Sequence, residues 1–171
     1  FGGGVLIGTL HGIHRSRPAG YLLDLGSTVA LSLPSLVLGL LALLFAARTG
    51  WFPLGSMSAL SPGSTFWSWL IDRIHHLALP VACLTLPILA YIERIQCAAT
   101  LDSLEQLCVR SARSRGLGSW RVFFQYNLRP SLNPVLSVSG PIFGAVLSGS
   151  LVLEVVFAWP GLGKATYDAL F

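Results

Sequence analysis

Charge is scarce in this chain. Asp, Glu, Lys and Arg together make up 11% of its 171 residues, whereas hydrophobic residues make up 53%. The mean hydropathy of +0.70 lies well beyond that of an average soluble domain. This composition argues against a soluble globular protein and predicts one whose uncharged runs lie in a lipid bilayer.

The charge that is present is unevenly spread. The net charge is +4, but five of the eleven basic residues fall between residues 109 and 134, and the others flank apolar runs. Nucleic-acid binding needs a basic face with aromatic or groove-entering elements. Arginines in loops beside membrane spans do not provide such a face, so we expect no nucleic-acid partner.

Cysteine is rare, and a targeting segment is not recognisable. Cys83, Cys97 and Cys108 have no CxxC spacing and cannot form a complete set of disulfides, so we interpret them as buried or cytoplasm-side thiols. The chain starts at Phe1 without a methionine and shows no signal-peptide pattern, and we take it as a fragment of a longer chain.

Motifs for catalysis, cofactors and metals are missing. Residues 161–166 partly match a phosphate-binding loop, but Ala158 and Ala165 stand where GxxxxGK[ST] needs Gly and Ser or Thr. No Ser–His–Asp or Cys–His set is suggested by spacing. Two histidine pairs lack a third convergent ligand, namely His11 with His14 and His75 with His76. We therefore expect no enzyme activity, no cofactor and no metal.

Long apolar runs are what the sequence does contain. Residues 25–47 carry no charge and would measure about 34 Å as a helix, enough to cross a hydrocarbon core of roughly 30 Å. Residues 77–100 and 132–153 form two further runs, and 1–13 is typical of the tail of a fourth span. We expect one all-helical, polytopic transmembrane domain, with kinks at Pro34, Pro80, Pro87 and Pro141.

The basic residues orient these spans. If the spans alternate, only Arg48, Arg73 and Lys164 fall on one side. The other side holds eight: Arg15, Arg17, Arg94, Arg110, Arg113, Arg115, Arg121 and Arg129. The positive-inside rule makes the second side cytoplasmic. Aromatic residues in the outer connection predict a short interfacial helix over 64–76.

Small residues recur at every fourth position in two stripes. They are Gly4, Gly8 and Gly12, and then Gly140, Gly144 and Ser148. Helices in lipid gain most from close backbone approach over small residues, so both stripes predict helix packing. Glycine is also simply frequent in membrane helices, and the partner helix lies either in this chain or in another subunit.

Residues 101–131 form the basic segment between two apolar runs. Ser103 and Gln106 have capping-box spacing, which predicts a helix from about Leu104. Gly116 can adopt positive φ and would end that helix. A second short helix is expected over 119–129, ending before Pro130.

This helix–glycine–helix hairpin has two interpretations. Its arginines alone would suit a loop that only sets topology. Its second arm, however, is rich in aromatic residues, which favours a docking element: Trp120, Phe123, Phe124 and Tyr126.

Acidic residues at the ends of apolar runs are candidate functional groups. Glu93 and Arg94 lie near the cytoplasmic end of a span, and we expect them to snorkel or to pair locally. Glu154 closes the 132–153 run, and such a group usually faces a bundle interior or an aqueous cavity. We favour a structural or gating role for Glu154 at the outer mouth over a proton relay.

Several segments resemble one family. VRSARSRGL at 109–117 is similar to the cytoplasmic EAA loop in membrane subunits of binding-protein-dependent ABC importers, in the dipeptide/oligopeptide/nickel permease group. LRPSLNP at 128–134 resembles that group's exit from the loop, and 154–163 resembles its E-x-x-F-x-x-PGLG signature. The resemblance covers essentially the whole chain.

The resemblance implies a permease subunit in the inner membrane that carries peptides or similar small solutes and has no catalytic residues. Implied partners are a second similar permease, two cytoplasmic ATP-binding subunits and an extracytoplasmic solute-binding protein. The implied ATPase-coupling residues are Arg110, Ser111, Ala112, Arg113, Gly116 and Leu117. The implied outer motif is Glu154, Phe157, Pro160, Gly161, Leu162 and Gly163. The alternative is a secondary transporter or channel subunit that works without ATPases.

Overall fold

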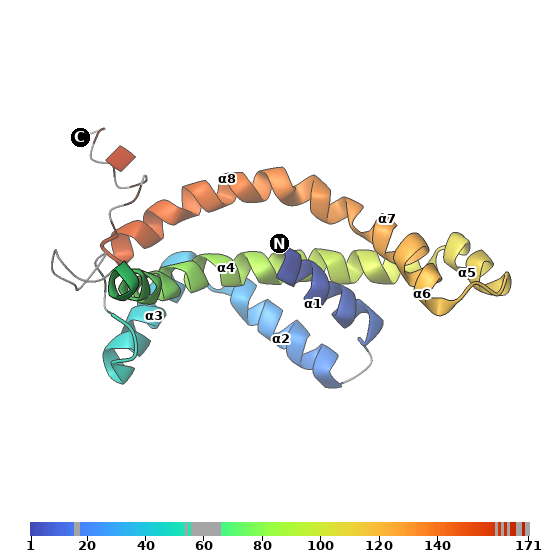
Figure 1. Ribbon diagram of the computed structural model, residues 1–171, viewed down its shortest axis with the longest axis horizontal. Helices are drawn as coiled ribbons and strands as arrows, with labels where there is room; N and C mark the ends of the chain where they lie inside the picture. The colour runs from blue at the N-terminus through green and yellow to red at the C-terminus, as the bar shows by residue number, and fades with distance from the viewer. Residues whose placement is uncertain are drawn as a thin grey trace. The chain divides into compact units, whose positions relative to one another are not determined.

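The computed structural model describes residues 1–15, 18–53, 55, 66–159, 161, 163, 165–166 and 169. Every element within them is helical, which confirms the predicted fold class (Figure 1). The helices are α1 (Gly2–Ile13), α2 (Pro18–Ser32), α3 (Ser35–Thr49), α4 (Phe66–Glu105), α5 (Leu107–Ser114), α6 (Ser119–Val122), the π-helical turn η1 (Phe123–Leu128), α7 (Arg129–Ser131) and α8 (Asn133–Val156).

Two continuous helices are long and apolar enough to cross a membrane. One is α4, with 40 residues, and the other runs for 38 residues from Ser119 through α6, η1 and α7 to Val156 at the end of α8. A third candidate arises if α2 and α3 are counted as one broken span. These lengths and compositions are those of a multi-pass membrane protein.

Three predicted boundaries differ from the structure. The expected interfacial helix over 64–76 is not separate, because α4 begins at Phe66 and continues to Glu105. The expected unbroken span over 25–47 is divided into α2 and α3 at Leu33 and Pro34. Pro34 has φ −58° and ψ 144°, and proline both lacks an N–H and disfavours helical geometry in the residue before it.

The third difference is at Pro130, where the second arm of the hairpin was expected to end. The chain instead stays helical through Pro130 and into α8. Proline at this position removes the N–H that would bond the carbonyl four residues earlier, on Tyr126. That carbonyl accepts a hydrogen bond from Ser103 Oγ at 3.3 Å instead, and the π-helical turn η1 lies just before the proline.

The contacts of the described chain divide into two compact units. The first comprises 1–32 and 87–142, and the second comprises 33–86 and 143–171, so that α4 and α8 each contribute residues to both. In the first unit, α1 packs against the part of α4 from Leu89 to Thr100 (Figure 1). In the second unit, Cys83, Leu153 and Phe157 form a buried apolar cluster.

Candidate functional site

The hairpin has its turn at Gly116. Helix α5 ends at Ser114 with Arg115 as its C-cap, and Gly116 follows with φ +77°. The Gly116 N–H bonds the Arg113 carbonyl at 2.9 Å, and the Leu117 N–H bonds the Ala112 carbonyl at 3.3 Å. This pair of bonds is a Schellman motif, in which glycine ends a helix in the left-handed region. The predicted positive φ and helix stop at Gly116 are confirmed.

A small apolar core holds the two arms of the hairpin together. Val109 and Ala112 on α5 are fully buried against Val122 on α6, and Leu117 and Tyr126 pack around them. Burying a valine-sized side chain stabilises a fold by about 1.5–3 kcal/mol. Such a core makes the hairpin a folded unit with a defined shape.

The outer surface of the hairpin is basic and aromatic. Leu107 and Trp120 are 78% and 77% exposed, and the rings of Trp120 and Phe124 lie 4.7 Å apart. The implied coupling residues divide between this surface and the hairpin core. Ala112 is buried and Leu117 is half-buried, whereas four are exposed: Arg110, Ser111, Arg113 and Gly116.

Ser103 does not cap α5, which corrects the capping-box prediction. It lies within α4, and α5 starts only at Leu107, with Gln106 as a cap that makes no side-chain hydrogen bond. The Ser103 hydroxyl is 3.3 Å from the Tyr126 carbonyl and 3.1 Å from the Asn127 carbonyl. It therefore holds the second arm of the hairpin against α4.

Ser103 belongs to a buried polar seam that the sequence analysis missed. Asn127 Nδ2 donates to the Thr100 carbonyl at 3.1 Å, and Gln96 Nε2 donates to Ser131 Oγ at 3.0 Å. The α4 members are three or four residues apart and so lie on one face of the helix. This spacing within an apolar helix is the signal that would have found the seam: Glu93, Gln96, Thr100 and Ser103.

The outer motif surrounds Glu154, on the last turns of α8. The Trp159 N–H donates to the Glu154 carbonyl at 2.8 Å, and Phe157 is buried in the cluster with Cys83 and Leu153. A Cβ on Gly161 would overlap the Glu154 carboxyl group, and one on Gly163 would lie 2.9 Å from its Oε2. A side chain at position 161 would have to displace the carboxyl end of Glu154, and a Cβ at position 163 would also lie 2.9 Å from the Cα of Leu151. Two residues of the motif, Pro160 and Leu162, lie outside the described residues.

Cavities adjoin this motif within the second unit. One of about 160 Å³ is lined mainly by apolar residues of α4 and α8, together with Glu154 and Trp159. A wider one of about 510 Å³ is lined by Glu154, Gly161, Gly163 and Thr166 among others. Glu154 therefore borders cavities, as the sequence predicted for an acidic group at the end of an apolar run.

The two small-residue stripes have different surroundings. A Cβ on Gly8 would lie 2.5 Å from the Glu93 carbonyl oxygen, and one on Gly4 or Gly12 would lie 2.9 Å from a side-chain atom of Ile92 or Thr100. The first stripe is thus in backbone contact with α4. The second stripe is exposed on α8, and a Cβ on Gly140 or Gly144 would meet no described atom within 4 Å.

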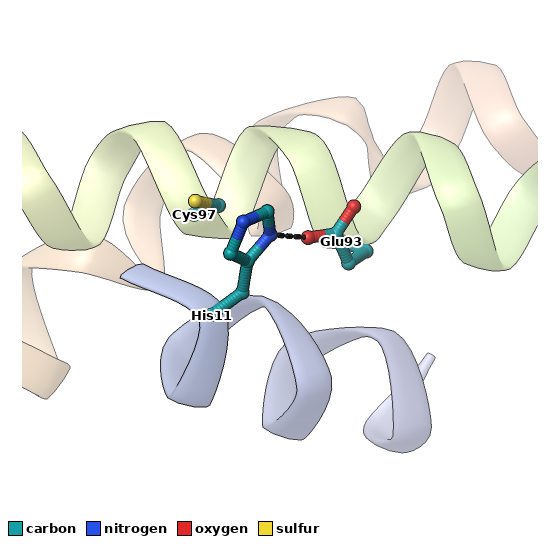
Figure 2. A group of neighbouring side chains, drawn as sticks. All are labelled: His11, Glu93 and Cys97. Carbon is teal, nitrogen blue, oxygen red and sulfur yellow. Dashed lines mark hydrogen bonds and ion pairs between the residues drawn. The ribbon is translucent and has the colours of Figure 1, made fainter. Parts of the chain in front are cut away.

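Glu93 was expected to snorkel or to pair locally, but it is buried and its partners lie on two other helices. It is 1% exposed; its Oε1 bonds His11 Nδ1 of α1, and its Oε2 accepts a hydrogen bond from Ser27 Oγ of α2 at 2.5 Å (Figure 2). Arg94 donates to Thr28 Oγ1 at 2.7 Å. The buried cluster of His11, Ser27 and Glu93 escaped the sequence analysis because its members are far apart in the chain.

Comparison with known proteins agrees with this architecture. The family described as "Binding-protein-dependent transport system inner membrane component" matches residues 4–171. The oligopeptide transport system permease protein AppB of Bacillus subtilis is 34% identical over 98% of this chain and 56% of its own length. The di/tripeptide transport system permease protein DppB of Pseudomonas aeruginosa is 36% identical over 95% of this chain and 54% of its own length.

A third relative, the oligopeptide transport system permease protein OppB of Haemophilus influenzae, is 34% identical over 94% of this chain and 49% of its own length. The chain spans about half the length of these relatives. The resemblance noted in the sequence is thus confirmed over nearly all of this chain, which belongs to the family of inner membrane components of binding-protein-dependent transport systems.

Proposed function

We propose that this chain is a permease subunit of an ABC importer and forms part of a translocation path for peptides or similar small solutes. The relatives named above are oligopeptide and di/tripeptide permeases, which supports a peptide cargo. In this proposal the chain is not an enzyme. Separate cytoplasmic ATPase subunits hydrolyse ATP, and the chain converts their movement into transport.

The main support for the proposal is the structure of the hairpin. Its turn is fixed by Gly116, its arms share a buried core, and its outer surface is exposed and basic. Its first arm follows α4 directly, and its second arm continues into α8 as one helix. A force applied to the hairpin is therefore passed to both long apolar helices, as alternating access requires.

In this proposal the partners bind at three places on the chain. Of the two cytoplasmic ATP-binding subunits, one docks on this hairpin, and an extracytoplasmic solute-binding protein delivers cargo at the end that carries Glu154. A second, homologous permease subunit packs on the exposed stripe of Gly140, Gly144 and Ser148, since small residues allow close approach of helices in lipid.

A pair of glycine variants tests the coupling role. Gly116 and Gly118 are both exposed and both have room for a Cβ, but Gly116 has φ +77° whereas Gly118 has φ −58°. Gly116→Val places a β-branched residue in the left-handed backbone region, which favours glycine. The conformational strain costs roughly 1–3 kcal/mol. Gly118→Val is the matched control because its backbone geometry suits valine.

We expect Gly116→Val to insert normally and to lose about 10-fold or more of solute-stimulated ATP hydrolysis in proteoliposomes, since about 1.4 kcal/mol corresponds to a factor of ten. Gly118→Val should retain that activity. Normal ATP-driven uptake by Gly116→Val would remove the coupling role. Uptake driven by a proton gradient without any ATPase would favour a secondary transporter instead.

A further inference from the structure

We propose that His11, Glu93 and Cys97 form a binding site for a divalent transition metal ion of the zinc type, held between α1 and α4. All three side chains are buried, and one ligand atom from each lies within 4.8 Å of the others. Figure 2 shows the imidazole of His11 directed at the stretch of α4 that carries Glu93 and Cys97. Imidazole nitrogen, carboxylate oxygen and thiolate sulfur are the ligands that Zn²⁺ takes in proteins.

The backbone of both helices places these ligands. Glu93 and Cys97 are one turn apart on α4 and so project from the same face. His11 lies between Gly8 and Gly12, where a Cβ would be 2.5 Å from the Glu93 carbonyl oxygen and 3.1 Å from that of Cys97, respectively. The glycine stripe of α1 thus brings the histidine to the level of its two co-ligands.

The charges of the site match a divalent cation. The Glu93 carboxylate and a Cys97 thiolate together carry two negative charges, which a divalent ion neutralises in a buried position. Coordination by the Cys97 thiolate releases the thiol proton, and the proton of the hydrogen bond between His11 Nδ1 and Glu93 Oε1 leaves both ligand atoms, to Nε2 or to solvent. No redox step is needed.

The surroundings of the three ligands are those of a supported metal site. The hydroxyl of Ser27 donates to Glu93 Oε2 at 2.5 Å, which leaves Oε1 to face the ion. His11 Nε2 has no hydrogen-bond partner among the described residues, and Asp24 Oδ2 lies 3.8 Å from it. A carboxylate beside the second ring nitrogen is the usual means of orienting a metal-binding histidine.

Such an ion would clamp α1 to α4 within the first unit. The site is independent of the transport proposal, since it requires neither the hairpin nor an ATPase. A metal-free network of His11, Ser27 and Glu93 is the competing explanation for the same geometry, and it gives no role to Cys97. The test therefore substitutes Cys97.

The experiment titrates the purified, metal-stripped permease in detergent with Co²⁺, whose thiolate complexes absorb by charge transfer. We expect a saturable thiolate–cobalt band that Zn²⁺ abolishes by competition. Cys97→Ser, which keeps the shape of the side chain but removes the thiolate, should lose the band. Cys108→Ser is the matched control, because Cys108 is exposed and lies outside the cluster, and it should keep the band.

Asp24→Asn supplies a graded readout. It should keep the thiolate–cobalt band but weaken cobalt binding by about 10- to 100-fold, the usual effect of removing a carboxylate that orients a metal-binding histidine. A wild-type protein without the band, or a band that persists in Cys97→Ser, would overturn the site. So would a band that disappears in Cys108→Ser.

Discussion

Gly8 shows how much depends on single residues where α1 meets α4. The Glu93 carbonyl oxygen occupies the space that a side chain at position 8 would need. The contact brings His11 close to Glu93, and so a buried carboxylate finds a partner on another helix. An ionisable group in an apolar helix without such a partner would cost several kcal/mol. The pairing of Glu93 with His11 therefore depends on the backbone contact at Gly8.

A glycine-to-alanine pair measures this contact. We expect Gly8→Ala to destabilise the protein by about 1–3 kcal/mol, because the added methyl group must push α1 away from α4. Gly26→Ala on α2 is the control, since a Cβ there meets no described atom within 4 Å. It should be neutral or stabilising by up to about 1 kcal/mol through helix propensity. Thermal unfolding in detergent compares the two, and equal melting temperatures would contradict the packing role of Gly8.

Single residues also show what could be predicted from the sequence and what could not. Gly116 was predictable because a helix stop depends on neighbours in the chain. The cluster around Glu93 was not, since His11 is 82 residues away and Ser27 is 66 residues away. His11 was considered only beside His14, its neighbour in sequence. The ligands that converge on it come from α4, and no local spacing reports that.

At the scale of elements, the prolines of this chain differ in whether a helix continues through them. Pro34 ends a helix, whereas Pro141 lies inside α8 and Pro80 and Pro87 lie inside α4. Pro130 is accommodated because Ser103 serves the Tyr126 carbonyl. The apolar runs predicted which segments are helical, but not that the helix continues through Pro130, because the donor that compensates for this proline belongs to another element.

Ser103 and Pro130 form a testable pair. Ser103→Ala should destabilise the hairpin by about 1–3 kcal/mol, because the Tyr126 and Asn127 carbonyls lose the hydroxyl as a donor. In a Pro130→Ala background the restored N–H can serve the Tyr126 carbonyl, so the same change should be less harmful. Thermal unfolding of the four proteins in a double-mutant cycle gives the coupling.

The control for this cycle is Ser111→Ala, which removes an exposed hydroxyl from the first arm of the hairpin and should be near neutral. Additive effects of Ser103→Ala and Pro130→Ala would show that the serine does not compensate for the proline.

At the scale of the whole molecule, the orientation of the chain in the membrane rests on the asymmetry of eight basic residues against three. The helices themselves have no preferred direction in lipid. If the arginine count is decisive, the hairpin faces the cytoplasm and the end of α3 faces outward. That orientation is a requirement for the proposed docking of ATPases.

Two exposed positions test this orientation in intact cells. Cys108 is a native exposed thiol on the hairpin, and Thr49 is exposed at the end of α3. A membrane-impermeant maleimide added from outside should label Thr49→Cys in a Cys108→Ser background and should leave native Cys108 unlabelled. Permeabilised cells provide the control, because Cys108 should then react and so prove that its thiol is accessible. Labelling of Cys108 from outside, with Thr49→Cys protected, would show that the orientation is the opposite of the predicted one. The hairpin would then lie on the side of the membrane that no cytoplasmic ATPase can reach.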